Sequence, residues 1–208
     1  NHKKVNKKEY KEIKKNLIKN GYCVIENFIS PGECNYIKNK IIRFIKKNPK
    51  HTIVDNEKSD SRIHGAEFIC SKIRDYFSSN YLKSIGEEYS NNKLKNLMTM
   101  ANKTIFRKKN KGSGNGWHRD SINIQYKSIL YLNDVNADNG AFQIIENSKS
   151  KNEILKFLIL NNLDPSKTSF SENLIKKNLK DKKLKLKTLI GKKGTLILVD
   201  TSCIHRGS

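Results

Sequence analysis

The residues best suited to chemistry stand together at the start of an expected strand, directly after a glycine-rich stretch. They are Trp117, His118, Arg119 and Asp120. Side chains of an extended chain alternate between faces, so His118 and Asp120 point one way while Trp117 and Arg119 point the other. A converging imidazole and carboxylate are suited to holding a metal ion. A second histidine would complete the facial set of two histidines and one carboxylate that leaves three positions open on Fe(II).

The best candidate for the second histidine is His205. It follows the apolar segment 195–199 after a short turn-like stretch, from which a double sheet could bring it back beside the first pair. The H-x-D tripeptide alone is weak support, because a chain with five His and 20 acidic residues easily contains one by chance. A buried histidine bonded to a neighbouring aspartate is the alternative interpretation, since buried polar groups normally find partners.

Helices and one strand are predicted in the first half of the chain. Residues 5–19 carry a narrow apolar stripe among lysines and predict an amphipathic helix. Residues 22–29 are rich in β-formers and predict a buried strand. A capping box of Ser30 and Glu33 predicts a second helix that runs to about residue 47. Residues 50–65 are polar without clear periodicity, and a further helical layer is expected over 66–89.

The second half changes to short strands separated by glycine-rich turns. Strands are predicted over residues 97–101, 104–107, 122–126, 128–132, 141–145, 184–190 and 195–199. Residues 150–182 interrupt them with two helical stretches, an insertion that could form a lid over a site. Helices followed by many short strands predict an α+β fold with a mainly β core. We expect a double-stranded β-helix of the jelly-roll or cupin-like kind, backed by N-terminal helices.

Composition narrows the class of protein. A chain of 208 residues suits one domain, with 1–93 as a helical support region and 94–208 as the β core. The net charge of +22 could attract nucleic acid, but only six of the 42 basic residues are Arg, the type that recognition surfaces favour. The longest apolar runs are strand-sized, so no membrane span is expected. No apolar segment typical of a secretory signal follows the first residues, which favours the cytoplasm.

Four cysteines occur without any C-x-x-C pair and lie within or beside apolar segments, which is typical of buried thiols in a reducing compartment. Cys203 is the one closest to a candidate ligand, two residues before His205. It could sit near a reactive centre, although a buried cysteine commonly behaves as a small hydrophobe.

Several segments together resemble the phytanoyl-CoA dioxygenase superfamily of Fe(II)/2-oxoglutarate-dependent oxygenases. In chain order these are residues 21–34, 114–121, 126–135, 139–145 and 194–207. The resemblance spans almost the whole chain and is weakest at 50–90 and 150–182. It implies a double-stranded β-helix with iron held by His118, Asp120 and His205. It also implies oxidation of a small organic substrate, usually hydroxylation, coupled to conversion of 2-oxoglutarate and O2 into succinate and CO2. Relatives that halogenate have a small residue in place of the carboxylate, so Asp120 disfavours halogenation.

Further candidate site residues surround the triad. Asn102 and Thr104 could donate hydrogen bonds to 2-oxoglutarate, and Lys127, with Gln125 on its face, could offer a cation to a carboxylate. Arg62 and His64 could meet an anionic substrate, although surface exposure is the default for such residues. The family usually anchors 2-oxoglutarate with an Arg after the second iron histidine. Arg206 should point away from the metal, so we expect that Arg beyond Ser208.

A non-catalytic metal- or metabolite-binding β-barrel is the alternative function that this missing Arg leaves open. A basic nucleic-acid-binding protein is the third hypothesis, motivated only by the charge. The leading hypothesis is a non-haem iron, 2-oxoglutarate-dependent dioxygenase.

Overall fold

A computed structural model of the chain describes residues 6–56, 58–105 and 116–207. The predicted glycine-rich stretch at 111–115 and the end of the strand predicted to residue 107 lie outside this part. The helices are α1 (Lys7–Asn20), α2 (Pro31–Lys47), α3 (Ser71–Phe77), α4 (Asn80–Ser90), α5 (Lys151–Leu160) and α6 (Glu172–Lys180), with the 3-10 turns η1 (Pro49–His51) and η2 (Ala66–Phe68). The strands are β1 (Tyr22–Ile25), β2 (Ile53–Val54), β3 (Asp60–His64), β4 (Met100–Thr104), β5 (Trp117–His118), β6 (Tyr126–Leu130), β7 (Phe142–Ile145), β8 (Ser169–Phe170), β9 (Leu186–Leu189), β10 (Leu196–Asp200) and β11 (His205–Gly207).

The predicted helix ends are confirmed in detail. The Ser30 side chain accepts a hydrogen bond from the Glu33 backbone, and the Glu33 side chain accepts one from the Ser30 backbone, so the capping box at the start of α2 is complete. Helix α1 ends at Gly21, whose φ of 88° lies in the left-handed region that glycine enters without strain. These local signals therefore fix where α1 ends and where α2 begins.

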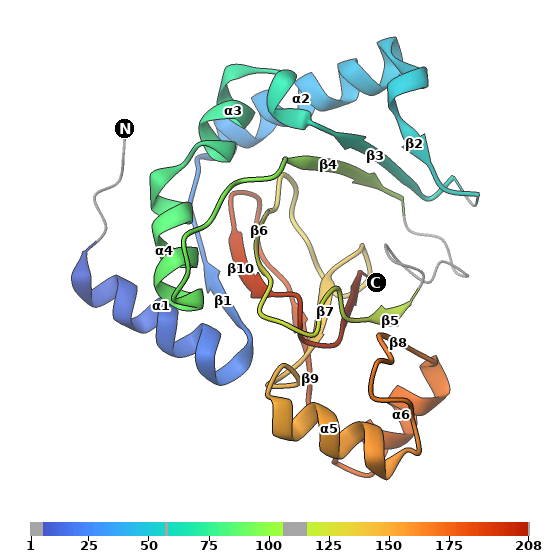
Figure 1. Ribbon diagram of the computed structural model, residues 1–208. Helices are drawn as coiled ribbons and strands as arrows, with labels where there is room; N and C mark the ends of the chain where they lie inside the picture. Colours follow the sequence, from blue (N-terminus) through green and yellow to red (C-terminus); the bar gives the residue numbers. More distant parts are fainter. Residues whose placement is uncertain (1–5, 57, 106–115, 208) are drawn as a thin grey trace.

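Two antiparallel sheets pack face to face and form the β core (Figure 1). One has the strand order β1-β10-β6 and the other β8-β5-β11-β7-β9. The core cluster that links β10 with β7 and β9 consists of buried apolar side chains, Tyr131, Ile144, Leu189, Ile197, Val199 and Cys203. Burying one such large side chain contributes about 1.5–3 kcal/mol, so this layer holds the two sheets together. The expected double sheet with a mainly β core is confirmed.

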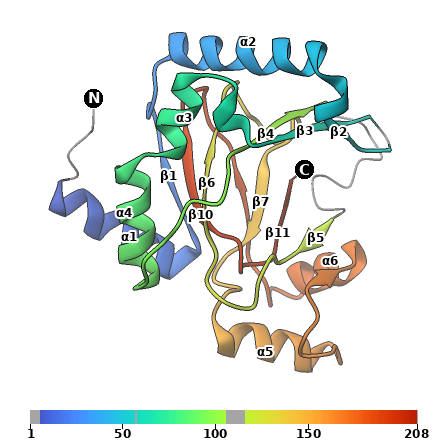
Figure 2. The same cartoon turned by 45° about the horizontal axis from the view of Figure 1, so that its top comes forward.

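Helices cover the outer faces of both sheets. Helices α1 and α4 pack on Leu196 and Leu198 of β10. Helices α5 and α6 pack on Trp117 and Ile145 of the second sheet. A third sheet, β2-β3-β4, packs against α2, which runs above it in Figure 2. No described helix is long and apolar enough to cross a membrane.

Several predicted strands are wrong in position. The polar segment 50–65 contains β2 and β3, which sequence patterning missed because their burial depends on β4 and α2 rather than on apolar alternation. The sequence predicts two strands over 97–101 and 104–107, whereas the described residues of this stretch, 97–105, form one strand, β4. Residues 122–126 were predicted as a strand, but 121–125 form a loop with Ile122 and Ile124 exposed. The β-forming residues there find no partner strand, because the backbone of Gln125 bonds to the turn at 200–201 instead.

The insertion (residues 150–182) contains the two predicted helices, α5 and α6, but it does not cover the candidate ligands as a lid would. Its apolar side chains pack around Trp117 and Ile204. Those two residues neighbour His118 and His205 in sequence and point to the opposite face of the sheet. The insertion therefore lies behind the strands that carry the candidate ligands.

Candidate metal centre

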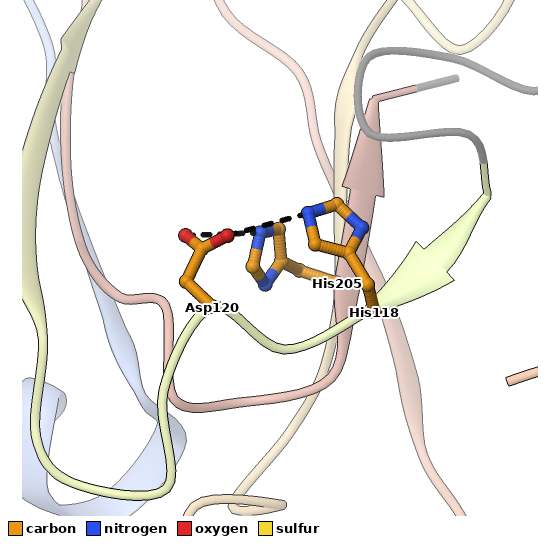
Figure 3. A group of neighbouring side chains, drawn as sticks. All are labelled: His118, Asp120 and His205. Carbon is orange, nitrogen blue, oxygen red and sulfur yellow. Dashed lines mark ion pairs between the residues drawn. The ribbon is translucent and has the colours of Figure 1, made fainter. Parts of the chain in front are cut away.

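The second sheet brings the two candidate histidines together. His118 ends β5 and His205 begins β11, and these residues are direct cross-strand partners. Their ring centroids lie 4.4 Å apart. Asp120 follows β5 by two residues, and its carboxylate oxygens lie 3.4 Å from Nε2 of His118 and 3.7 Å from Nε2 of His205 (Figure 3). Two segments separated by more than eighty residues thus present three ligand-type side chains to one point.

Backbone carbonyls orient both imidazoles. Nδ1 of His118 lies 2.9 Å from the carbonyl oxygen of Gly116, and Nδ1 of His205 lies 2.8 Å from that of Cys203. A ring nitrogen that donates to a carbonyl leaves the other nitrogen with its lone pair free. Nε2 of each histidine therefore faces Asp120 as a potential metal ligand.

The three side chains fit a metal ion. One ligand atom from each of His118, Asp120 and His205 can be chosen so that all lie within 4.8 Å of one another, and no larger His/Cys/Asp/Glu group of this kind occurs in the described residues. Two imidazoles and one carboxylate match the facial set that non-haem Fe(II) uses. The His205 side chain is only 5% exposed, whereas those of His118 and Asp120 are about one-fifth exposed. The cluster is thus anchored in the core and open on one side.

The surroundings shift the pKa values of His205, His118 and Asp120 in different ways. Burial lowers the pKa of His205 to about 4, so this imidazole is neutral at physiological pH. The hydrogen bond to Asp120 raises the pKa of His118 above its ordinary value. Burial raises the pKa of Asp120, but hydrogen bonds from His118 and Lys127 outweigh it and bring that pKa well below the usual range. Asp120 is therefore ionised, and a proton on His118 must leave before a metal binds.

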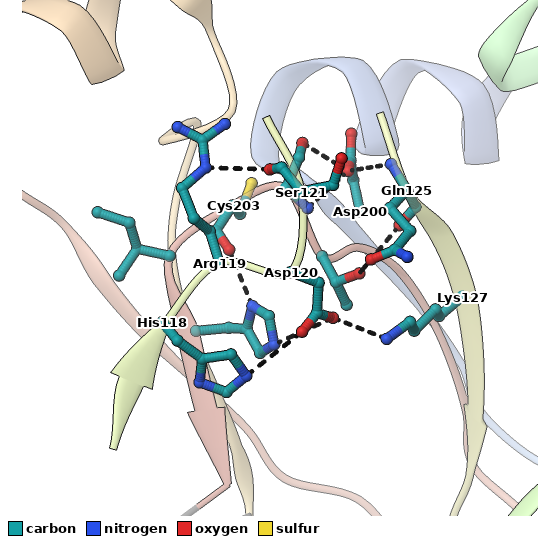
Figure 4. A network of polar contacts seen from close by, with 12 residues as sticks. His118, Arg119, Asp120, Ser121, Gln125, Lys127, Asp200 and Cys203 are labelled. Carbon is teal, nitrogen blue, oxygen red and sulfur yellow. Dashed lines mark hydrogen bonds and ion pairs between the residues drawn. The ribbon is translucent and has the colours of Figure 1, made fainter. Parts of the chain in front are cut away.

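The turn at 200–203 positions two of the candidate ligands at once. The backbone N–H of Asp120 donates to the carbonyl of Thr201 over 2.9 Å, and His205 bonds to the carbonyl of Cys203. The turn itself is organised by Asp200, which is fully buried and accepts hydrogen bonds from Tyr89 and Ser202. Asp200 also accepts a hydrogen bond from the backbone of Gln125 (Figure 4). A fully satisfied buried carboxylate of this kind rigidifies its surroundings.

Two of the other predicted site residues lie beside the cluster. Nζ of Lys127 on β6 lies 2.7 Å from Oδ2 of Asp120. Gln125 precedes β6, and its side-chain oxygen accepts a hydrogen bond from the Thr201 hydroxyl over 2.9 Å. The ring of Phe142, which sequence reasoning did not select, stacks on His205 with centroids 5.1 Å apart.

The remaining predicted residues have other partners. Asn102 and Thr104 lie on β4, where both are exposed, and Asn102 bonds to Asp60 over 3.5 Å. Among the described residues, neither is hydrogen-bonded to the His–Asp–His cluster. Arg62 pairs with the same Asp60 at 2.6 Å, and His64 is exposed at the end of β3.

The orientations predicted for Arg206 and Trp117 are confirmed. The guanidinium of Arg206 stacks over the Trp117 ring, 4.4 Å from its centroid, and pairs with Glu172. Trp117 is buried in the cluster formed with the insertion. Both side chains thus lie on the face of the sheet that is opposite to the His–Asp–His cluster.

The family model for phytanoyl-CoA dioxygenase (PhyH) matches residues 17–208. The chain belongs to this family. Solved structures with the same fold include the epimerase SnoN from nogalamycin biosynthesis, in complex with Fe3+, alpha ketoglutarate and nogalamycin RO. It has 11% identity and a TM-score of 0.68, with 98% of this chain and 78% of that chain covered. The comparison with curated proteins gives no match.

Two other solved structures share the family fold. HygX from Streptomyces hygroscopicus, with nickel, 2-oxoglutarate and hygromycin B bound, has 12% identity and a TM-score of 0.63, with 98% of this chain and 81% of that chain covered. EctD from S. alaskensis, with bound Fe, has 12% identity and a TM-score of 0.62, with 98% and 71% covered. The fold class predicted from sequence is therefore confirmed.

The residues that sequence reasoning missed are those that support the cluster from other elements. Asp200 carried one usable signal, because it is a carboxylate that ends the apolar run of β10. Glu172 and Phe142 carried none, because their proximity to the histidine strands arises only from tertiary packing.

Proposed function

We propose that the chain is an Fe(II)/2-oxoglutarate-dependent dioxygenase in which His118, Asp120 and His205 hold the iron. The observation that carries the proposal is the convergence of one ligand atom from each residue within 4.8 Å, with both imidazoles oriented by backbone carbonyls. Membership of the phytanoyl-CoA dioxygenase family supports it. Complexes of SnoN with Fe3+ and alpha ketoglutarate, and of HygX with nickel and 2-oxoglutarate, support the choice of metal and co-substrate.

When bound, Fe(II) with 2-oxoglutarate and O2 would supply the oxidising chemistry, with release of succinate and CO2. The role of the protein is to hold the metal ligands in the required positions and protonation states. His205 is held neutral by burial, and Asp120 is held ionised by its two hydrogen-bonding partners. The Phe142 ring covers one face of the His205 imidazole and keeps water from that side.

Lys127 is the group we propose for contact with an anion. Its side chain is 48% exposed while its Nζ lies against Asp120, so it can reach a carboxylate of 2-oxoglutarate or of an anionic substrate. Gln125, Asn102 and Thr104 are our further candidates for co-substrate contacts. Of these, Gln125 has the strongest support because it bonds to the same turn that positions Asp120.

We propose hydroxylation of a small organic molecule as the reaction outcome, because that outcome needs no group beyond the iron site and the co-substrate. SnoN is an epimerase and SnoK a carbocyclase, so product analysis by mass spectrometry is the measurement that decides. A gain of one oxygen atom supports hydroxylation, and a product of unchanged or two-hydrogen-lower mass contradicts it.

The chain is proposed to work as one domain in a reducing compartment such as the cytoplasm. Helices from both halves pack on the sheet pair that bears the cluster. All four cysteines are free thiols, and burial raises the pKa of Cys203 to about 12, which makes this thiol unreactive rather than catalytic.

Anaerobic titration with Fe(II) and 2-oxoglutarate tests the proposal. We expect a weak visible charge-transfer band in the wild type, its loss in His118→Ala, and its retention in His51→Ala, a matched change at an exposed histidine outside the cluster. Succinate formed without added substrate would separate this enzyme from a non-catalytic metal-binding barrel. A folded wild type that gives neither band nor succinate would contradict the proposal.

A further inference from the structure

The back of the second sheet carries a contact that joins the two histidine strands. Trp117 precedes His118 and Arg206 follows His205, so both side chains point to the face opposite the His–Asp–His cluster. There the Arg206 guanidinium stacks on the Trp117 ring at 4.4 Å. The contact sits directly behind the pair of imidazoles.

One carboxylate oxygen completes this contact from the insertion. Oε2 of Glu172 accepts a hydrogen bond from Nε1 of Trp117 over 2.9 Å and one from Nη1 of Arg206 over 2.6 Å. Glu172 occupies the first turn of α6, whose N-terminus is capped by the side chain of Ser171. Its position is therefore set by the helix. Charge-assisted hydrogen bonds of this kind are stronger than neutral ones.

Direct pairing between the two histidine strands is short. Strands β5 and β11 share a single register pair, His118 with His205. On its other edge β5 pairs with β8 of the insertion, Trp117 with Phe170 and His118 with Ser169. A typical hydrogen bond contributes only about 0.5–1.5 kcal/mol net, so the pairing of β5 with β11 alone defines the distance between the imidazoles weakly.

The insertion adds the apolar packing that the short strands lack. Ile154, Phe157 and Ile175 of α5 and α6 pack in one buried cluster with Trp117 and Ile204. The residues that flank each histidine in sequence are thus held by the same two helices. Packing, strand pairing and the Glu172 contact all act on β5 or β11, and all come from residues 150–182.

We propose that the insertion is a brace for the metal centre and that Glu172 is its positioning residue. Glu172 holds Trp117 and Arg206 together from behind and so fixes the separation of the His118 and His205 imidazoles. The inference rests on the proposed function, because the separation matters only if the two histidines share a metal. The insertion, where the sequence resembles the family only weakly, would thus determine the positions of the metal ligands rather than cover the site.

Binding of Co(II) to the whole chain tests the brace without relying on turnover. We expect Glu172→Ala to weaken Co(II) binding about tenfold, the lower end of the range for outer partners of metal ligands, and to change the visible Co(II) spectrum. Glu172→Gln keeps an acceptor for the indole N–H and should recover part of the loss. Lys176→Ala is the matched control, since Lys176 is exposed on the same helix and also pairs with Glu172, at 3.5 Å. It should leave affinity and spectrum unchanged.

Three outcomes have distinct meanings. If Glu172→Ala lowers only the thermal stability of the metal-free protein and leaves Co(II) affinity and spectrum at wild-type values, Glu172 is merely structural and the inference fails. If Arg206→Lys, which keeps a cation beside Glu172 but loses the planar stacking, weakens Co(II) binding and the double variant with Glu172→Ala is no worse than Glu172→Ala alone, the brace is supported. If the folded wild type binds no Co(II), the proposed metal site fails, and this inference fails with it.

Discussion

Nζ of Lys127 lies 2.7 Å from Oδ2 of Asp120, so the one carboxylate of the cluster is already paired with a cation. Asp120 also lies close to Nε2 of both imidazoles, at 3.4 Å from that of His118 and 3.7 Å from that of His205. A cation at this position opposes the charge of an incoming divalent metal and favours the charge of an incoming dianion. Lys127 should therefore affect metal and co-substrate in opposite directions.

Replacement of Lys127 by Met should weaken 2-oxoglutarate binding to the Co(II)-loaded protein about fivefold, and leave Co(II) affinity equal or higher. The expected size corresponds to about 1 kcal/mol for a half-exposed charge. Isothermal titration of metal and then of 2-oxoglutarate measures both. Lys127→Arg keeps the charge and should stay near wild type. Unchanged 2-oxoglutarate affinity in Lys127→Met would show that Lys127 serves Asp120 alone.

His205 and His118 should affect the free energy of unfolding of the metal-free protein with opposite dependences on pH. His205 has a folded-state pKa of about 4, below its ordinary value, so the unfolded chain binds the extra proton and stability falls as pH drops from about 6.5 towards 4. The pKa of His118 is raised, so its contribution is fully present below the unfolded pKa and is lost as pH rises through the folded one.

Urea unfolding of metal-free protein at pH 7.5 and pH 5 measures these contributions. Relative to wild type, His205→Asn should gain on the order of 2 kcal/mol between the two pH values, while His118→Asn should lose stability over the same interval. His51→Asn, at an exposed position, controls for removal of an imidazole. The same sign of change in both cluster variants would contradict the opposite pKa shifts of His205 and His118.

Gly194 is required by a close backbone approach just before β10. Its φ is +89°, and a Cβ there would collide with the carbonyl oxygen of Ile29. Gly194→Ala should therefore lower the free energy of unfolding by more than 2 kcal/mol, because both strain and a clash with rigid backbone arise. Gly32→Ala is the matched control. Gly32 lies in α2, where a Cβ would meet only the Ser30 hydroxyl oxygen, at 3.9 Å, and its replacement should be neutral or stabilise by up to about 1 kcal/mol. Equal effects in denaturant titrations would refute this account.

The core strands and the shared face of His118 and Asp120 could be predicted because short-range patterns encode them, whereas the choice of His205 depended more on the family resemblance. The continuous apolar run of β10, fully buried in the structure, predicted its strand, and alternation about His118 predicted the faces of Trp117 and Asp120. Strand β5, which carries His118, is only two residues long. Alternation was correct beyond its end because the backbone of Asp120 is held by the carbonyl of Thr201 rather than by a ladder.

What the sequence could not reveal depends on long-range packing. The segment 50–65 is polar in composition, yet its Ile63 is buried against α2, and its Asp60 is buried and paired with Arg62. The position of the insertion behind the sheet follows from α5 and α6 docking on Trp117 and Ile204. Helical periodicity predicts that these helices have apolar faces, but it carries no information on which side of a sheet they cover.

The hydrogen bonds of Asp200 should stabilise both the fold and the geometry of the site. It is fully buried, and Tyr89 donates a hydrogen bond to its Oδ2 over 2.5 Å while Ser202 and the Gln125 backbone occupy Oδ1. Removing the Tyr89 hydroxyl leaves the buried carboxylate one donor short, at a cost of about 1–3 kcal/mol. Tyr89→Phe should lower the free energy of unfolding by that amount, while Tyr36→Phe, at an exposed ring, should change it by less than about 0.5 kcal/mol.

Metal binding distinguishes a loss of stability from a loss of site geometry in the same variant. Because the turn that Asp200 organises also supplies the carbonyls that hold Asp120 and His205, Tyr89→Phe should weaken Co(II) binding severalfold under conditions where the protein is fully folded. Lys149, whose Nζ lies 2.9 Å from the Tyr89 hydroxyl, provides a second approach. Lys149→Met leaves the Tyr89–Asp200 bond intact, so Co(II) affinity should stay within twofold of wild type. If Lys149→Met weakens Co(II) binding as much as Tyr89→Phe does, the positive charge of Lys149, and not the hydrogen bond from Tyr89 to Asp200, determines the geometry of the turn.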